Sequence, residues 1–179
     1  MSNRALRIID ANLNRCREGL RVIEDCLRFV LNDEILYKKV RRIRHNTDKI
    51  LRDRYCDLII QRDSFNDKGR QIKETSKKDL PSIITANFKR AQESLRTLEE
   101  YSKTFAPKIC AEFKKQRYNA YNVEKAVFLK HKKSLYSSPL AGEDAAKRQV
   151  RGLAKSINRE AQTRSVPRPL RERMSRSGR

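Results

Sequence analysis

The sequence lacks the residues that usually identify a zinc site, a disulfide framework or a membrane span. It has no tryptophan, five glycines, five prolines and four cysteines, none of which form a Cys-x-x-Cys pair. Two histidines give too few partners for a zinc site, and so helical a chain does not rely on a disulfide framework. No run approaches the ~20 apolar residues that cross a bilayer, and the charged N-terminus has no apolar signal segment. We therefore expect a reduced, cytoplasmic protein without a zinc site.

Positive charge is what the chain has in excess. It carries 43 Lys and Arg against 22 Asp and Glu, for a net charge of +21. Such an excess favours nucleic acids or phosphorylated small molecules as partners. Composition changes towards the C-terminus: residues 134–179 use nine Arg but two Lys and no Phe, whereas residues 1–133 use the two cations equally. We therefore predict a folded domain over 1–133 and a basic, mostly disordered tail over 134–179.

The chain contains an internal sequence repeat. Residues 8–25 and 83–100 are identical at 9 of 18 aligned positions, whereas unrelated segments would share about one. Apolar residues recur at intervals of three and four, which predicts amphipathic helices. The expected helices are 3–31, 33–54, 80–105 and 108–131. We therefore predict an all-α fold, in which a duplicated helical hairpin forms a four-helix bundle with a pseudo-two-fold axis.

The repeated units are about 4–54 and 80–131, joined by a linking loop over 55–79 without a helical period. At the same offset of 75 residues, the second helix aligns with the fourth and Arg42 with Arg117. A connection of this length is unusual in a compact domain, and such loops are often functional.

The two copies keep a set of polar residues, although neighbouring charges differ between them. On a helical wheel Asn12 and Asn87 fall inside the apolar arc, where an unbonded amide costs about 1–3 kcal/mol. The charged residues kept beside them are Arg15, Glu18, Arg21 and Glu24, repeated as Arg90, Glu93, Arg96 and Glu99. One interpretation is structural, with asparagines bonded to each other or to a carbonyl across the axis, and a solvated salt-bridge face. The other is a pocket for an anion, with a carboxylate available for a hydroxyl or a metal-bound water.

The linking loop adds further groups suited to phosphate. Its donors are Arg62, Lys68, Arg70 and Lys73. Asp63 and Asp67 could hold Mg²⁺ through water, because Mg²⁺ takes one or two carboxylates together with substrate phosphates. The alternative is a charged surface loop.

Five stretches of the sequence resemble a known family. They are RALRIIDANLNRCREGLRVIED, RH at 44–45, RDS at 62–64, ANFKRAQESLRTLEEYSK and RYNAYNVEKA. Over residues 4–130 the chain resembles the all-helical hydroxymethylpyrimidine-phosphate kinase-like domain commonly found ahead of thiamin-phosphate synthase. The resemblance implies ATP-dependent phosphorylation of hydroxymethylpyrimidine phosphate to its diphosphate, with ATP and Mg²⁺. The ligand-binding candidates carried over are Asn12, Arg15, Glu18, Arg21, Arg62, Asp63, Asn87, Arg90, Glu93 and Arg96; no catalytic role is assigned to any of them.

Two other functions remain open at this point. No strand–helix alternation follows the helical domain, so thiamin-phosphate synthase activity cannot reside in this chain. The chain is then either the kinase or a non-catalytic structural or regulatory N-terminal module of a thiamin-phosphate synthase. A basic RNA-binding bundle would explain the charge but not the conserved pattern of Asn and Glu between copies, and aromatics are only 7% of the chain. The expected partners are a small phosphorylated pyrimidine, ATP and a thiamin-phosphate synthase domain, with no membrane and no set oligomeric state.

Overall fold

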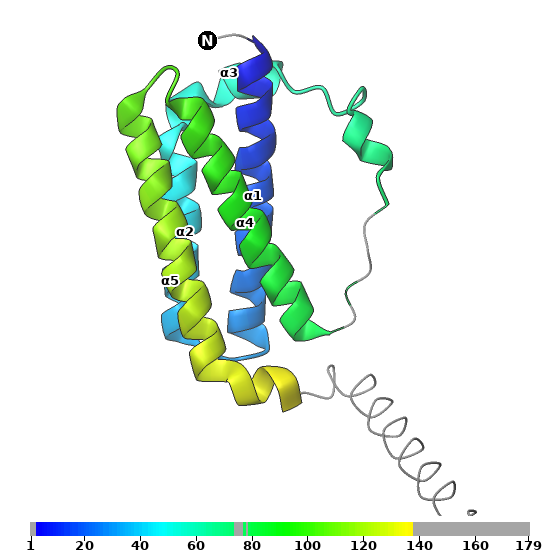
Figure 1. The fold of residues 1–179 in the computed structure, drawn as a ribbon, viewed down its shortest axis with the longest axis vertical. Coiled ribbons are helices and arrows are strands. Elements are labelled where there is room, and N and C mark those ends of the chain that lie inside the picture. Colours follow the sequence, from blue (N-terminus) through cyan, green and yellow to red (C-terminus); the bar gives the residue numbers. More distant parts are fainter. Residues whose placement is uncertain (1–2, 74–76, 78, 138–179) are drawn as a thin grey trace, which may run out of the picture. The chain divides into compact units, whose positions relative to one another are not determined.

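The computed structural model describes residues 3–73, 77 and 79–137, and within that part of the chain it contains helices and turns but no strand (Figure 1). This confirms the predicted all-α class. Residues 134–137 of the predicted tail belong to α5, which corrects the predicted boundary at 133, and residues 138–179 lie outside the described residues. The elements, in chain order, are α1 (Asn3–Phe29), α2 (Glu34–Ile50), η1 (Arg52–Arg54), α3 (Tyr55–Ile60), η2 (Lys68–Gln71), α4 (Leu80–Ser102) and α5 (Pro107–Ser137).

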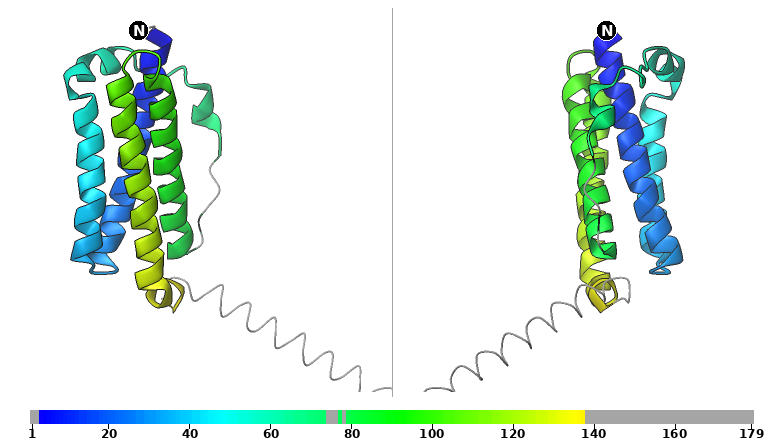
Figure 2. Two further views of the ribbon diagram at one scale, coloured as in Figure 1. Left: turned by 60° about the vertical axis from the view of Figure 1, so that its left-hand side comes forward. Right: turned by 90° about the vertical axis from the view of Figure 1, so that its right-hand side faces the viewer.

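The four long helices form a bundle of two hairpins. Within the hairpins α1 packs on α2 and α4 on α5, and between them α1 packs on α4 and α2 on α5. Figures 1 and 2 show that α1 and α4 run in opposite directions, so α3 and the start of α4 lie at opposite ends of the bundle. The connection over 61–79 therefore has to return along the bundle, and we call it the crossover. Its described part passes beside α1 and α4.

The helices begin where side chains satisfy their first backbone N–H groups. Asp33 accepts from the Leu36 N–H at 3.1 Å and caps α2. Asp79 accepts from the Ser82 N–H at 2.8 Å and caps α4, with Pro81 in the first turn. Both starts agree with the sequence prediction, because Asp as N-cap and Pro at the first helical positions are general start signals. Asn32, at φ 50°, supplies the left-handed residue between α1 and α2.

The core is apolar along the inner faces of all four long helices, and α1 lies close to α4 at a glycine. A Cβ on Gly19 would lie 2.9 Å from the Asn87 carbonyl oxygen, so only glycine fits there. Gly19 corresponds to Ser94 in the repeat, and Asn87 corresponds to Asn12. Because α1 and α4 are antiparallel, the pseudo-two-fold axis passes near the matched pair Arg15 and Arg90, midway between these positions.

The largest differences from the predicted boundaries are in the second helix, the linking loop and the fourth helix. The second helix ends at Ile50, and the expected loop contains the one-and-a-half-turn helix α3, whose Leu58 is buried, and the 3-10 turn η2. Six residues are too few to show a helical period. The fourth helix continues to Ser137, and Leu135 in this extension is fully buried. No helix in the described ranges is long and apolar enough to cross a membrane.

Candidate functional site

A buried glutamate marks the same place in each hairpin. Glu24 of α1 is fully buried and binds Arg44 of α2, with N–O distances of 2.5 and 3.2 Å. Glu99 of α4 is 3% exposed and binds Arg117 of α5 at 2.9 and 2.8 Å. A buried carboxylate requires such a partner, because an unpaired buried charge is strongly destabilising. These two pairs join the helices of each hairpin.

The two pairs also correct the sequence alignment of the second helices. The glutamate and arginine are 20 residues apart in the first hairpin and 18 apart in the second. The counterpart of Arg117 is therefore Arg44, and its predicted alignment with Arg42 is wrong. Both connections, 30–33 and 103–106, have four residues, but α1 runs five residues beyond Glu24 whereas α4 runs three beyond Glu99. The two extra residues of α1 lower the offset from 75 to 73 residues. Divergence of α2 and α5 had hidden this shift.

The outer arginines of the repeat are held by the same carboxylates. Arg21 lies 3.8 Å from Glu24 and 3.3 Å from Asp25. Arg96 lies 2.9 Å from Glu99 and 2.6 Å from Glu100. Each hairpin thus carries an Arg–Glu–Arg cluster whose outer member is exposed. The expected pairing of Arg21 with Glu24, and of Arg96 with Glu99, is present.

The two asparagines have matching bonds within their own helices. Asn12 Nδ2 donates to the Ile8 carbonyl at 2.9 Å, and Asn87 Nδ2 donates to the Ile83 carbonyl at 2.8 Å. One interpretation of the sequence placed the hydrogen bonds of these asparagines across the pseudo-two-fold axis. The observed bonds instead lie within each helix. Asn12 is 7% exposed, and Asn87 is more open to solvent.

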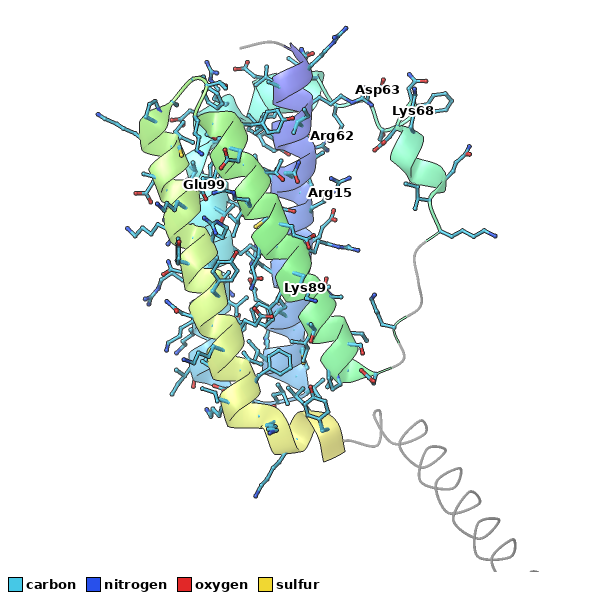
Figure 3. All side chains as sticks on the ribbon, viewed as in Figure 1. Arg15, Arg62, Asp63, Lys68, Lys89 and Glu99 are labelled. Atoms are coloured by element: carbon cyan, nitrogen blue, oxygen red, sulfur yellow. The ribbon has the colours of Figure 1, made fainter. Side chains whose placement is uncertain are left out.

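Four of the ten candidate residues meet in one groove between α1 and α4. The groove has a volume of about 510 Å³, within the range of ~300–1,000 Å³ that small-molecule sites occupy. Figure 3 shows Arg15 projecting from α1 and Lys89 lying on the neighbouring α4. The lining residues of this α1–α4 groove are Asn12, Arg15, Ala86, Lys89, Arg90, Glu93, Ser94 and Thr97.

Glu18 and Arg21 lie in a separate recess on another face of α1. This recess has a volume of about 450 Å³, and Arg17 and Arg44 also line it. The candidates on α4 are thus divided: Arg90 and Glu93 line the groove, whereas Arg96 belongs to the Arg–Glu–Arg cluster and Asn87 is bonded within α4. The structure thus brings four of the ten candidates together in the α1–α4 groove and places the other six outside it.

The two candidates from the crossover are tied to α1. Arg62 donates both Nε and a terminal nitrogen to the nearly buried Asp10, each at 2.7 Å, and this bonding raises the pKa of Arg62. Hydrogen bonds from the backbone and side chain of Asn66 lower the pKa of Asp63, with a smaller effect of Arg7. Arg7 also donates to the Asp63 carbonyl at 2.7 Å. Figure 3 places Arg62, Asp63 and Lys68 together on the described part of the crossover.

The groove is suited to an anionic ligand. It has three cations, Arg15, Lys89 and Arg90, against the single carboxylate of Glu93. Arg15 forms no ion pair within the described residues, so its guanidinium is available to a ligand. No group of three His, Cys, Asp or Glu in the described ranges is placed to hold a metal ion. Glu93 is one carboxylate, which together with ligand phosphates fits the coordination that Mg²⁺ prefers.

Lys89, Ser94 and Thr97 were not among the sequence candidates. They differ from their counterparts Asn14, Gly19 and Val22, so the repeat could not single them out. A wheel of α4 would have found them, because at 100° per residue they fall on the same flank as Arg90 and Glu93. The groove is therefore lined mainly by α4 of the second copy. Comparison of the two copies pointed only to the lining residues that both copies share.

Comparisons with known proteins agree on the nature of the domain. The family whose model matches is the ThiD2 family, over residues 7–126. The chain is similar to the thiamine-phosphate synthase of Nostoc punctiforme, with 40% identity over 121 residues that cover 66% of this chain and 34% of the relative. It is also 40% identical to the thiamine-phosphate synthase of Rhodopirellula baltica over 134 residues, covering 72% and 36%. The chain thus spans about a third of the length of these curated relatives. No solved structure matches.

Proposed function

Because the chain belongs to the ThiD2 family, we propose that it serves thiamine biosynthesis as the helical structural or regulatory module of a thiamine-phosphate synthase. The observation that carries the proposal is the 40% identity to a third of two proteins named thiamine-phosphate synthase. The match covers about a third of each relative, and we assign the synthase reaction to the part of a synthase outside that match.

The bonding of the repeated residues supports a structural module. Asn12 and Asn87 bond to their own helices, and Glu24 and Glu99 each hold two arginines. Much of what the duplication preserved therefore stabilises the bundle. A rigid bundle is a suitable platform for a second domain to pack against.

The groove favours a second function, a kinase for hydroxymethylpyrimidine phosphate. In that reaction a phosphate oxygen of the acceptor forms a bond to the γ-phosphorus of ATP, and the bond to the β–γ bridging oxygen breaks to release ADP. Such a transfer depends mainly on positioning and on neutralising charge. Arg15, Lys89 and Arg90 would neutralise the phosphates, Glu93 would hold Mg²⁺ together with them, and no activated nucleophile is needed from the protein.

One experiment separates the two functions. In the Nostoc punctiforme synthase, the 121 matched residues are deleted, and synthase activity is measured with the pyrimidine diphosphate supplied directly. A structural or regulatory module predicts loss of activity or of stability, restored when this chain is grafted in place. It also predicts that this chain alone forms no ADP from ATP, Mg²⁺ and the pyrimidine monophosphate. Unchanged synthase activity and stability after the deletion would contradict the module.

If the chain is instead a kinase, the expected results of the deletion and of the assay on this chain are the opposite. The deletion should then spare the reaction from the diphosphate, and this chain alone should release ADP. Arg15→Ala should lower that turnover by roughly 10²–10³-fold, the usual effect of removing one electrostatic donor. Arg42→Gln provides the matched control, because Arg42 is an exposed arginine outside the groove.

A further inference from the structure

A second pocket, the α3 pocket, lies on the other side of α1 from the groove. Leu13 and Arg17 point towards it, about 150° around the helix from the mean direction of Asn12 and Arg15, at 100° per residue. It forms where α2 ends and the chain turns through η1 into α3, which packs on α1. Its volume is about 290 Å³, and it is lined by Leu13, Arg17, Asp48, Leu51, Arg52, Tyr55 and Leu58.

The pocket arises where the first hairpin departs from the second. A phenyl ring, Phe88, takes the place of Leu13 in the second copy and is completely buried. Gln92 takes the place of Arg17 and donates to Glu124 of α5 at 2.6 Å. There α5 continues without interruption, whereas α2 ends at Ile50. In the first hairpin, the smaller Leu13 and the end of α2 thus leave a space open. In the second hairpin, Phe88 and α5 fill the corresponding space.

The lining combines an apolar floor with a charged rim. Leu13, Leu51 and Leu58 are each at most 8% exposed, yet they line the pocket. Tyr55, at the rim, is 53% exposed. Such a floor with an aromatic edge suits a flat, apolar ring, because aromatic pairs stack or meet edge to face.

The rim carries one net positive charge. Arg17 and Asp48 form an ion pair at 2.9 Å and balance each other. Arg52 forms no ion pair within the described residues, and its guanidinium is exposed. One acidic group on a ligand would therefore complete the electrostatics of the pocket, and Asp48 can accept a hydrogen bond from an amino or hydroxyl substituent.

We propose that the α3 pocket binds a small molecule made of one planar aromatic ring and one acidic group. The ring lies on the three leucines against Tyr55, and the acidic group binds Arg52. The volume sets the size, because about 290 Å³ is just below the range of ~300–1,000 Å³ for ligand sites and admits a single ring with its substituents. This site is separate from the α1–α4 groove, and the proposal rests on the lining of the α3 pocket alone, although the pyrimidine phosphate of the second function belongs to the same chemical class.

The test uses the full chain and the probe phenyl phosphate, followed by protein NMR chemical shifts. We expect shifts at Leu13, Leu51 and Leu58 that saturate with phenyl phosphate, and at least about tenfold weaker binding of inorganic phosphate, which lacks the ring. Leu13→Phe copies the residue of the second hairpin and should abolish binding of the probe. Arg52→Gln should weaken it by about tenfold or more, as loss of a charge-assisted hydrogen bond does.

Two further variants serve as a control and as a second test of the α3 pocket. Arg42→Gln removes an exposed arginine of α2 outside this pocket and should leave binding unchanged. If Leu13→Phe does not fold, Tyr55→Ala changes a half-exposed side chain and should weaken binding alone. Equal binding of phenyl phosphate and inorganic phosphate, or full binding by folded Leu13→Phe or Tyr55→Ala, would overturn the proposal.

Discussion

At the scale of the residue, the repeated glutamates are of two kinds, buried and exposed, which cannot be told apart in the sequence. Glu24 and Glu99 are buried and bound by arginines from the neighbouring helix, whereas Glu18 is exposed and forms no ion pair within the described residues. On the wheel Glu24 falls just outside the apolar arc, at about 120° from Asn12. Only the position of Arg44 across the hairpin decides that this carboxylate is buried.

Glu24→Ala should therefore destabilise the fold strongly. It leaves the guanidinium of Arg44, 15% exposed, without its carboxylate, and breaking a buried pair typically costs about 3–5 kcal/mol. We expect the free energy of unfolding in urea to fall by that amount, with an unchanged slope. Glu18→Ala is the control and should change it by no more than about 0.5 kcal/mol. Equal, small effects of the two variants would show that the buried pair is not needed.

At the scale of the element, helix starts could be predicted and helix interruptions could not. Asp33, Asp79 and Pro81 give local signals, because capping depends on a side chain and the N–H groups next to it. α3 is held by the burial of Leu58 against the bundle, which no local pattern reports. The groove was half predicted: Arg15 and Arg90 match in the repeat, whereas Lys89 has no matching lysine in the first copy, and no local pattern reports that α1 packs on α4 beside it.

The contact between α1 and α4 gives a prediction at Gly19. Gly19→Ala gains about 1 kcal/mol of helix propensity, but its Cβ would lie 2.9 Å from a backbone oxygen that cannot rotate away. Overpacking of this kind costs about 1–3 kcal/mol. We expect a net loss of stability in thermal unfolding, and changed NMR shifts in the α1–α4 groove. Ser94→Ala, at the matching position of α4, should be tolerated; a stabilised Gly19→Ala protein would contradict the close approach.

The joint between the hairpins gives a prediction on pH. Burial alone would raise the pKa of Asp33, but hydrogen bonds from Lys130, His131 and the Leu36 N–H hold it well below its usual range. Its His131 contact is 2.6 Å and its Lys130 contact 2.7 Å. A lowered folded pKa stabilises the protein above the unfolded value near 3.9, and the stabilisation is lost as pH falls through the folded pKa.

Asp33→Asn should reveal this dependence. The variant keeps a side chain that can cap α2 but loses the charge that holds α5. In urea unfolding from pH 2 to 6, we expect wild type to exceed the variant by a constant amount above about pH 5, and the difference to shrink below about pH 4. A difference that is the same at every pH would show that the carboxylate charge contributes nothing.

At the scale of the whole molecule, four long helices within the described residues pack on one another and share one core, and the last of them ends at Ser137. A chain ending at Ser137 should therefore fold with nearly the stability of the full chain. Thermal unfolding followed by circular dichroism measures this, and a shift of more than a few degrees would show that residues 138–179 support the bundle. Ending the chain at 133, the predicted boundary, should be more harmful, because it removes the fully buried Leu135.

The crossover has a consequence for how the hairpins find each other during folding. Each hairpin closes through a few residues, whereas Gly19 and Ala91, which meet between α1 and α4, are 72 positions apart. Closing the longer loop costs about 2–3 kcal/mol more in chain entropy, since that cost grows with the logarithm of length. In return, the tether holds the second hairpin near the first at an effective concentration in the millimolar range. Cutting the backbone within the crossover replaces that value with the real concentration, so the melting temperature of the cut protein will rise with the amount dissolved.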